Sequence, residues 1–364
     1  MNNNIFDYLD WRGDLGFDSD PFNEVDNLVL SVISYIDFSN IVPPEPNSGG
    51  ITLHDAYSKL EQLHKEHQDL GLIVPDQTCD FLKCAANTYR FGGIRLYSYV
   101  DKIDENLEMQ FSAITFALPD KTLFVAYRGT DDTLVGWREN FNMSFASPVP
   151  AQISAVDYLS DIAASMRGKL RLGGHSKGGN LAVWAAVNAD AKIQRRIISA
   201  YNNDGPGFED RITERKEYLA IADRLITFVP ESSVVGMLLE HMETYLIVKS
   251  FQNTLLQHDP FSWEIKGREF IKARELSSFS KRTDMALTSW ISSMTPDARR
   301  HTTDVLFNIL ESTGAKTLSD INDGKLKNIG IILKSLTSVD KETKDNLALL
   351  IRKIFEFDRI FMWK

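Results

Sequence analysis

The sequence predicts an α/β fold in which a mostly parallel sheet is covered by helices on both faces. Three observations lead to this prediction: two β-rich runs at 111–118 and 122–127, apolar strand-like runs that alternate with helical stretches between 170 and 248, and a glycine-rich turn at 173–179. Short apolar strands separated by amphipathic helices are typical of parallel sheets, because the crossover helices cover both faces. With 364 residues, 43% of them hydrophobic and 25% charged, the chain can bury a large core.

The first 50 residues form a predicted helical and loop segment that packs on the core. An apolar run at 28–36 is typical of a helix, and the loop after it closes on the proline-rich stretch 43–46. Apolar residues at helical spacing predict a second helix over 52–67, and a short helix is predicted at 79–87.

Residues 51–268 form the predicted α/β core. The runs at 111–118 and 122–127 are joined by a short turn and predict a β-hairpin. After this hairpin, strands and helices alternate along the chain. Strands are predicted at 170–172, 197–201, 225–229 and 245–248, and helices at 180–187 and 216–222.

Residues 269–364 form a predicted helical region, because strand signals end at about Arg268. Thr295 followed by Pro296 is a favourable helix start, with threonine as the N-cap and proline in the first turn. Another helix is predicted at 347–354. The chain then ends in an aromatic stretch at 355–363, which either packs on the core or touches a membrane.

The charge balance excludes some classes of partner. Forty Lys and Arg residues against fifty Asp and Glu residues give a net charge of −10, so binding to nucleic acid or to anionic membrane surfaces is not expected. Cys79 and Cys84 lie in one segment and are expected to be reduced. The sequence shows no signal-peptide pattern and no apolar run of the about 20 residues that cross a bilayer, so a cytoplasmic protein without a transmembrane segment is expected. No metal or cofactor is predicted, and the sequence fixes no oligomeric state.

The segment 173–180 contains the pattern G-x-S-x-G directly after a predicted strand and before a predicted helix. This strand, turn and helix context is the one that a nucleophile elbow requires. In such an elbow Ser176 adopts a strained backbone conformation, and Gly174 and Gly178 must lack side chains that would collide across the turn. We therefore predict Ser176 as a nucleophile; the alternative is an ordinary glycine turn.

A serine nucleophile needs a base, and in this architecture the histidine follows the serine in the chain. Three histidines qualify. His258 is favoured because it lies in a loop after the last predicted strand, from which it can reach the elbow. His241 lies in a segment that looks helical, and His301 belongs to a basic surface.

Two carboxylates could orient that histidine. Asp204 follows the strand predicted at 197–201, and Glu231 follows the strand predicted at 225–229. Both positions are at the carboxyl ends of strands, where α/β sites gather. Asp204 is favoured narrowly over Glu231. An Asx-type turn is the alternative for Asp204, and a helix-start acid is the alternative for Glu231.

An oxyanion hole requires donors aimed at the developing negative charge. The backbone N–H of Lys177, directly after the serine, is one predicted donor. The loop 128–132 follows the second hairpin strand, and Thr130 offers it an N–H and a hydroxyl, while Gly129 allows close approach of the backbone. An ordinary acidic turn is the alternative for this loop.

Three further histidines receive structural interpretations. His175, next to the serine, is expected to point away from it and to be buried and hydrogen-bonded. His64 and His67 form an H-x-x-H pair that is expected on a solvated helix face, with a metal site as the alternative.

Several of these motifs together resemble the paired signature of class 3 (fungal-type) lipases. The two parts are 125–130 with Trp137 beyond them, and 174–179. More closely, the chain resembles the Mbeg-like bacterial family of lipase-like proteins of unknown function over roughly residues 5–270. The stretches that carry this closer resemblance are 7–9, 11–14, 22–28, 204–208 and 257–261.

The resemblance implies an α/β-hydrolase fold with Ser176 as nucleophile, His258 as base, and Thr130 and Lys177 as oxyanion donors. Class 3 lipases keep an aspartate after the strand that corresponds to 225–229, where this chain has Glu231. The acid has then either moved to Asp204, as in pancreatic-type lipases, or been lost. No lid is recognisable.

Two functional hypotheses follow. The first is a serine hydrolase that cleaves an acyl ester, lipid or thioester through a Ser-His-acid triad and an acyl-enzyme. The second is a catalytically impaired, lipase-like binding module that recognises a lipid, peptide or protein partner. The displaced acid and the apolar stripes of the C-terminal helices motivate the second hypothesis.

Overall fold

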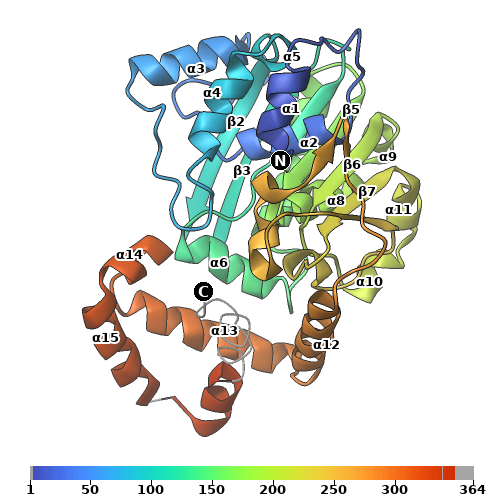
Figure 1. The fold of residues 1–364 in the computed structure, drawn as a ribbon. Helices are drawn as coiled ribbons and strands as arrows, with labels where there is room; N and C mark the ends of the chain where they lie inside the picture. The colour runs from blue at the N-terminus through green and yellow to red at the C-terminus, as the bar shows by residue number, and fades with distance from the viewer. Residues whose placement is uncertain (1–2, 338, 349–364) are drawn as a thin grey trace.

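The computed structural model describes residues 3–337 and 339–348, and its centre is an eight-stranded sheet (Figure 1). The strands lie side by side in the order in which they occur in the chain. They are β1 (Ile51–Thr52), β2 (Arg95–Asp104), β3 (Met109–Ala117), β4 (Leu123–Tyr127), β5 (Leu170–His175), β6 (Ile197–Asn203), β7 (Leu225–Pro230) and β8 (Tyr245–Val248).

The sheet is antiparallel at one side and parallel at the other. Strands β1 to β4 pair antiparallel, and the predicted hairpin is formed by β3 and β4. Strands β4 to β8 are all parallel, with Val125 opposite Leu172 and Leu172 opposite Ala200. The prediction of an α/β fold with a mostly parallel sheet is confirmed.

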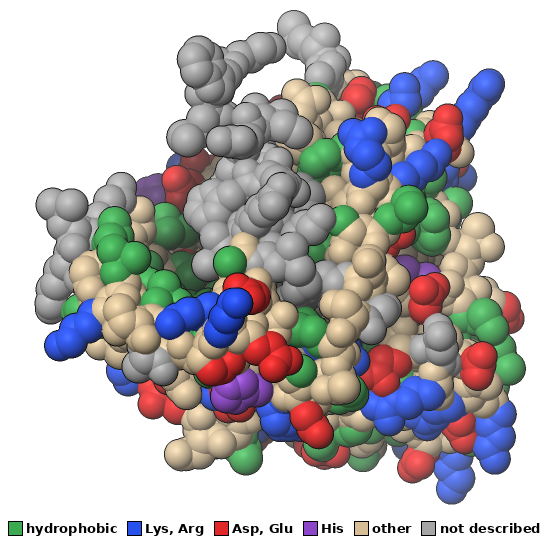
Figure 2. Space-filling view, turned by 90° about the horizontal axis from the view of Figure 1, so that it is seen from below, with side chains coloured by type: hydrophobic (Ala, Val, Ile, Leu, Met, Phe, Trp, Pro, Cys, Tyr) green, Lys and Arg blue, Asp and Glu red, His purple; other side chains and the backbone are tan. Residues whose placement is uncertain are grey.

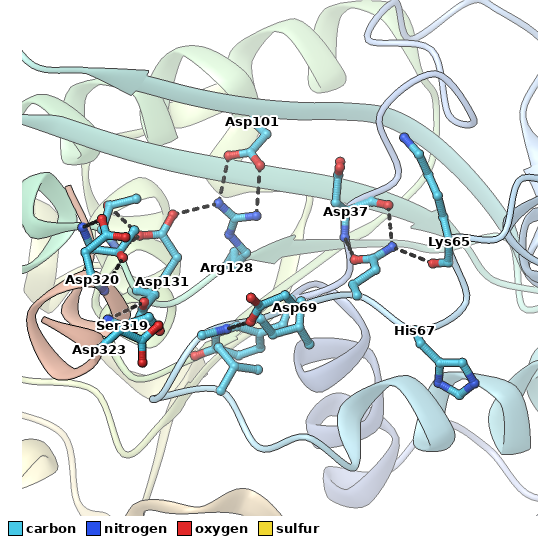
Figure 3. Close-up of a pocket in the computed structure, with 18 of the residues that line it drawn as sticks. Asp37, Lys65, His67, Asp69, Asp101, Arg128, Asp131, Ser319, Asp320 and Asp323 are labelled. Atoms are coloured by element: carbon cyan, nitrogen blue, oxygen red, sulfur yellow. Dashed lines mark hydrogen bonds and ion pairs between the residues drawn. The ribbon is translucent and has the colours of Figure 1, made fainter. Parts of the chain in front are cut away.

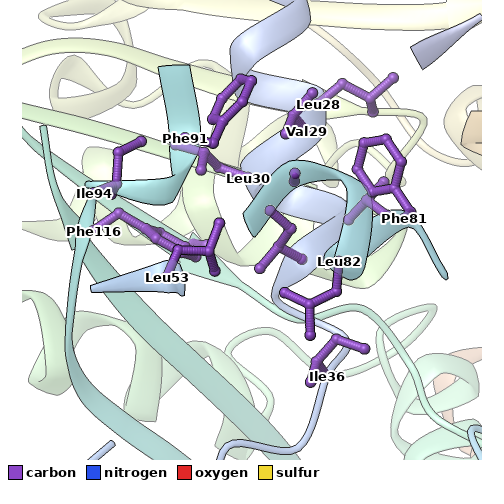
Figure 4. Packing of buried hydrophobic residues seen from close by; sticks show 14 of the residues in the cluster. Leu28, Val29, Leu30, Ile36, Leu53, Phe81, Leu82, Phe91, Ile94 and Phe116 are labelled. Carbon is purple, nitrogen blue, oxygen red and sulfur yellow. The ribbon is translucent and has the colours of Figure 1, made fainter. Parts of the chain in front are cut away.

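Helices from the N-terminal part of the chain cover one face of the sheet. They are α1 (Ile5–Arg12), α2 (Glu24–Ile33), α3 (Leu53–Gln62), α4 (Thr78–Ala86) and α5 (Tyr89–Gly92). Their apolar side chains and those of the sheet form one core, in which Leu28 of α2, Phe81 of α4 and Phe116 of β3 are fully buried (Figure 4). Helix α2 packs directly against β5, the strand that leads into the predicted elbow.

A second core fills the opposite face. It contains α7 (Pro150–Ser165), α8 (Lys177–Asn188) and α11 (Lys216–Leu219). In β4 the side chains alternate between the two cores: Phe124 and Ala126 belong to the first, and Val125 and Tyr127 to the second. This alternation follows from the two-residue period of a strand and explains why the whole strand is apolar. The remaining short helices on this side are α9 (Ala191–Gln194), α10 (Asp210–Thr213) and the 3-10 turn η1 (Ala222–Arg224).

The C-terminal region contains helices and no strand after β10 (Glu269–Phe270) among the residues that the structure describes. Its helices are α12 (Ser278–Ser292), α13 (Pro296–Glu311), α14 (Leu318–Asp323) and α15 (Lys325–Thr337). Thr295 caps α13 as predicted, since its side chain accepts from the N–H of Ala298. On the face that is seen from below the view of Figure 1, basic and acidic side chains are interspersed (Figure 2). The helix predicted at 347–354 and the aromatic stretch at 355–363 lie largely or wholly outside the described residues.

Helix α13 packs on α6 (Leu134–Asn142), which follows the loop 128–133. Phe307 of α13 and Leu134 of α6 are buried in a small third cluster, and Phe141 meets Phe307 edge to face with ring centroids 5.6 Å apart. The C-terminal region is thereby attached to the helix next to the predicted oxyanion loop. The division of the chain at residues 50 and 268 stays a prediction.

Several predicted elements differ from the structure. The helix predicted over 52–67 ends at Gln62, and His64 follows in the left-handed region with φ 53°. A short strand pair, β9 (Ile265–Lys266) and β10 (Glu269–Phe270), extends past the point at which strand signals were expected to end. Strand β2 was missed, because its charged second half and a bulge between Tyr97 and Val100 interrupt the apolar alternation.

Two smaller expectations concern the cysteines and the membrane. Cys79 and Cys84 are both free thiols, as expected. In the described part of the chain, no helix combines the length and the apolar character needed to cross a bilayer.

Candidate active site

The predicted site residues gather at one edge of the sheet. Strands β4 to β7 run parallel, so their carboxyl ends lie at the same edge. Thr130 follows β4, Ser176 follows β5, Asp204 follows β6 and Glu231 follows β7. Sites of open α/β sheets form at this edge because each strand delivers its next loop there.

Ser176 lies on a sharp turn between β5 and α8. Its backbone angles, φ 57° and ψ −133°, lie in a region that residues other than glycine rarely adopt. A Cβ on Gly174 would lie 2.3 Å from the backbone of Gly178, and a Cβ on Gly178 would lie 2.1 Å from the carbonyl oxygen of Tyr127. The turn therefore requires both glycines. The Ser176 hydroxyl makes no capping hydrogen bond to α8, which leaves it available for chemistry.

His258 is the last residue of the 3-10 turn η3 (Thr254–His258), which follows β8. Its Nδ1 lies 2.6 Å from Oδ2 of Asp204. The carboxylate is completely buried, and a quarter of the imidazole side chain is exposed. Because a carboxylate only accepts, Nδ1 carries the hydrogen and Nε2 of a neutral imidazole keeps its lone pair.

Asp204 is fixed by more than the histidine. Its Oδ1 accepts from the hydroxyl of Ser233 at 2.5 Å and from the N–H of Gly236 at 3.1 Å. Its own backbone has φ 53°, which aspartate tolerates better than most residues. These contacts orient Oδ2 toward His258. The carboxylate is therefore held by several specific hydrogen bonds and does more than close a turn.

The side chain of Glu231, the alternative acid, makes no hydrogen bond to His258 within the described chain. Its backbone N–H donates to Val248 of β8, and its carbonyl accepts from Ser277 in the chain segment before α12. Glu231 thus joins β7, β8 and the C-terminal region through its backbone.

The predicted base, His258, lies beside the elbow. The rings of His258 and His175, the neighbour of Ser176, have centroids 4.6 Å apart. In the described part of the chain, which includes both Ser176 and His258, no hydrogen bond joins the Ser176 hydroxyl to His258. Hydrogen bonds of this kind are often long in ligand-free enzymes and shorten only when substrate binds.

The two predicted oxyanion donors lie at the ends of neighbouring parallel strands. Lys177 is the first residue of α8, and the N–H groups of a first helical turn have no partner within the helix. The Oγ1 of Thr130 accepts from Nδ2 of Asn140 in α6 at 2.6 Å. Since that contact uses the oxygen as an acceptor, the hydroxyl hydrogen of Thr130 stays available for donation.

The side chain of Lys177 has a role that the sequence did not indicate. Its ammonium is buried and lies 2.9 Å from Oε2 of Glu139 in α6, 2.8 Å from the carbonyl of Gln110 and 2.5 Å from Oε1 of Gln110. Glu139 also accepts from the N–H groups of Gln110 and Ala151. This buried ion pair ties the start of α8 to α6, the helix after the Thr130 loop.

His241, an alternative base, is not on a helix as expected. Leu239 has φ 64°, and Glu240 forms a backbone bridge with Phe208, so tertiary pairing overrides the helical pattern. The ring of His241 lies between the carbonyl of Gly236 at 2.7 Å and Oε1 of Glu243 at 3.3 Å. Both ring nitrogens are therefore engaged away from Ser176.

The pKa of the Glu243 carboxyl beside it is lowered despite its burial. Burial alone would raise the pKa of the Glu243 carboxyl, but the hydrogen bond and charge of His241, with donors on Thr227 and Tyr218, lower that pKa to about 2.

His301, the third histidine, is largely exposed on α13 and lies 3.8 Å from Asp340.

A polar pocket of about 690 Å³ opens beside the loop that carries Thr130, and neither Ser176 nor His258 lines it. In Figure 3, Arg128 at its wall lies between Asp101 and Asp131, with ion-pair distances of 2.7 and 3.2 Å. His64 and His67 line this pocket in the loop after α3, so their predicted helix face is wrong. No group of three or more metal-ligating side chains occurs among the residues described.

The fold and the site define the class of protein. A mostly parallel sheet with a serine on a strained turn after β5, and with a paired histidine and aspartate on loops after later strands, is an α/β-hydrolase-type fold.

The chain belongs to the Mbeg1-like family, whose sequence model matches residues 85–308. No match is found among curated proteins. Similar solved structures include the M37 lipase, with 14% identity, a TM-score of 0.35 and coverage of 58% of this chain and 68% of that one. They also include the native Rhizomucor miehei lipase propeptide complex, with 12% identity, a TM-score of 0.36 and coverage of 62% and 67%.

Proposed function

We propose that this chain is a serine hydrolase that cleaves an ester or thioester through an acyl-enzyme. Ser176 is the nucleophile, His258 the general base and Asp204 the acid, with Lys177 and Thr130 as oxyanion donors. The observation that supports the proposal most directly is the 2.6 Å contact between His258 Nδ1 and Asp204 Oδ2, because it leaves Nε2 as the basic nitrogen.

In the proposed reaction, Nε2 of His258 takes the hydroxyl proton as Ser176 Oγ attacks the acyl carbonyl carbon. Negative charge develops on the former carbonyl oxygen, toward which Lys177 N–H and Thr130 donate. The intermediate collapses when the imidazolium gives its proton to the leaving alcohol or thiol, and the acyl group stays on Ser176. Water then loses a proton to His258 and attacks the acyl carbon, and the imidazolium returns the proton to Ser176 Oγ as the carboxylic acid leaves.

Asp204 contributes by holding one tautomer of His258 and by stabilising the imidazolium that forms. Its complete burial strengthens that electrostatic interaction, since little water competes for the carboxylate. The donors Ser233 and Gly236 keep the carboxylate oriented while the proton moves at the far side of the ring.

The second hypothesis, a catalytically impaired binding module for a lipid, peptide or protein, has one observation in its favour. Ser176 and His258 make no hydrogen bond to each other, although both lie in the described chain. If substrate binding does not bring the Ser176 hydroxyl within hydrogen-bond distance of His258, the site binds without turnover.

Turnover of p-nitrophenyl esters and of acyl thioesters across a range of acyl lengths separates the two hypotheses. Wild-type protein is compared with His258→Ala and with the matched control His301→Ala, whose side chain is largely exposed and faces Asp340. The proposal expects hydrolysis by wild type and by His301→Ala, and loss of hydrolysis in folded His258→Ala. Equal rates in His258→Ala and wild type would contradict it, and an absence of hydrolysis at every acyl length would favour the binding module.

A further inference from the structure

Tyr35, which follows α2 in the N-terminal segment, lies against the ring of His175. Its hydroxyl oxygen is 3.0 Å from Nδ1 of His175, while the carbonyl oxygen of His175 is farther away at 3.5 Å. Both side chains are buried, with exposed fractions of 8% and 5%. A buried tyrosine hydroxyl usually finds an acceptor, and the imidazole nitrogen is the closer one here.

The other ring nitrogen of His175 fixes the direction of this hydrogen bond. Nε2 lies 2.8 Å from the backbone carbonyl oxygen of His258. A carbonyl can only accept, so Nε2 carries the hydrogen, and a neutral ring then accepts at Nδ1 from the hydroxyl of Tyr35. Burial and the neighbouring His258 ring lower the pKa of His175 well below its usual range, in keeping with a neutral ring.

Tyr35 also contacts the loop that carries Thr130. Its hydroxyl oxygen lies against the backbone of Gly129, the residue before Thr130. A Cβ on Gly129 would lie 2.1 Å from that oxygen and 2.7 Å from the carbonyl of His175. Only glycine fits this close approach.

A second pair of residues holds the same helix to the site. Asn27 of α2 and Asn203 of β6 exchange hydrogen bonds of 2.8 and 3.2 Å through their side-chain amides, and Asn203 also donates to the carbonyl of Gly174 at 2.9 Å. Asn203 directly precedes Asp204. Helix α2 is thus fixed against the strands that deliver the proposed nucleophile and acid.

We propose that Tyr35 and His175 are positioning residues that fix the oxyanion loop and the backbone of the general base to each other. The bridge runs from the backbone of Gly129, which the Tyr35 hydroxyl contacts, through that hydroxyl to Nδ1 of His175, and from Nε2–H of His175 to the carbonyl of His258. This inference rests on the proposed function, because it concerns the placement of Thr130 relative to His258.

The bridge has a specific consequence. The oxyanion donor and the base belong to loops that no strand pairing joins directly, since one follows β4 and the other follows β8. Without the bridge, each loop keeps its own contacts but the separation between them is less fixed. The maximum rate then falls while ground-state binding of substrate changes little, because misplacement by a fraction of an ångström is felt mainly in the transition state.

Tyr35→Phe removes only the hydroxyl and tests the bridge. The matched control is Tyr158→Phe, which removes an equally buried tyrosine hydroxyl whose partners, Thr115 and the carbonyl of Ser98, lie away from the elbow. His175→Gln is a second variant, because it replaces the rigid ring that joins Tyr35 to His258 with a flexible side chain.

Two readouts are compared. Hydrogen exchange by mass spectrometry follows peptides that cover 128–133 and 254–262, and the second readout is the rate at which a fluorophosphonate labels Ser176. The bridge predicts faster exchange in both peptides of Tyr35→Phe and His175→Gln, and labelling slower by about 10- to 100-fold with full labelling at long times. Tyr158→Phe is expected to match wild type in both peptides and to label within about twofold of it.

Unchanged exchange in both peptides of Tyr35→Phe would overturn the bridge, whatever the activity. Faster exchange with a wild-type labelling rate would overturn its positioning role. Failure of the proposed function is distinct, because wild type itself would then not be labelled, while the exchange result would still decide whether Tyr35 and His175 connect the two loops.

Discussion

His258 Nδ1 lies 2.6 Å from Asp204 Oδ2, although the two residues are 54 positions apart in the chain and enter the site from different loops. The carboxylate is buried and receives two further hydrogen bonds, from Ser233 and Gly236. An acid with all its orienting contacts made before substrate binds is the arrangement that preorganised catalysis requires. The proposed triad therefore has its acid and base in direct contact.

We predict that Asp204→Asn lowers the rate of ester hydrolysis by about 10³- to 10⁴-fold, because an amide no longer enforces the tautomer with hydrogen on Nδ1. The matched control is Glu231→Gln, which changes the alternative acid at the end of the next strand. Steady-state kinetics of the two folded variants decides between them. A large loss in Glu231→Gln with little loss in Asp204→Asn would show that the acid has been assigned to the wrong residue.

The Lys177–Glu139 pair is expected to be important for stability. Replacing one partner leaves a buried charge without its counter-ion, so Lys177→Met should lower the free energy of unfolding by about 3–5 kcal/mol. Adding Glu139→Gln should recover part of that loss, since the remaining charge is removed. Lys316→Met, which breaks an exposed ion pair with Glu105, is the control and should leave the denaturation midpoint unchanged. Equal midpoints for Lys177→Met and Lys316→Met would contradict the buried pair.

The buried neutral His175 predicts a pH dependence of stability. Its pKa is lowered in the folded chain by burial and by the His258 ring, whereas the unfolded chain takes up the proton near the ordinary value of 6.5. The contribution of the neutral ring is therefore complete above pH 6.5 and is lost as the pH falls toward the folded-state pKa. Each pH unit in that window removes up to about 1.4 kcal/mol.

Chemical denaturation of wild type and of His175→Gln between pH 5 and 8 measures this effect as a difference of slopes. The wild-type free energy of unfolding should fall more steeply below pH 6.5 than that of the variant. Parallel curves would mean that His175 is not the group responsible.

The elbow glycines are expected to tolerate no side chain. Gly178→Ala places a methyl group 2.1 Å from the carbonyl oxygen of Tyr127, so we predict a loss of about 1–3 kcal/mol or more in the free energy of unfolding. Gly330→Ala in α15 is the control, because nothing lies within 4 Å of its added methyl group and alanine favours a helix. Its free energy of unfolding should rise by up to about 1 kcal/mol. Thermal or urea unfolding of both variants checks the contrast, and a stable Gly178→Ala variant would contradict the tight turn.

The parts of the fold that could be predicted from the sequence are those with a strong local pattern. The runs that became β3 to β8 are short and apolar, and a tight turn or helical stretches separate them, so their pattern indicates buried strands. Strand β2 could not be predicted, because its bulge at Ser98, with φ 56°, and its charged second half break the alternation. The segment around His241 resembles a helix locally, but its pairing with Phe208 is a tertiary contact that no local pattern contains.

The candidate site divides in the same way. The order of Ser176, Asp204 and His258 along the chain, each after a predicted strand, suffices to suggest that they meet, because parallel strands end at one edge. The bridge through Tyr35 could not be predicted, since it joins residues 140 positions apart and depends on the exact packing of the end of α2 on β5. The burial of the Lys177 ammonium could not be predicted either, because lysine is ordinarily exposed and its partner Glu139 lies on a helix that the sequence did not indicate.

The most direct test of the central claim is the intact mass of the full chain after treatment with a fluorophosphonate, measured on wild type and on Ser176→Ala. Such a probe reports an activated serine without any assumption about the substrate. The account predicts one adduct on wild type and none on Ser176→Ala. Folded wild-type protein that acquires no adduct, or a Ser176→Ala variant that is still labelled, would contradict it.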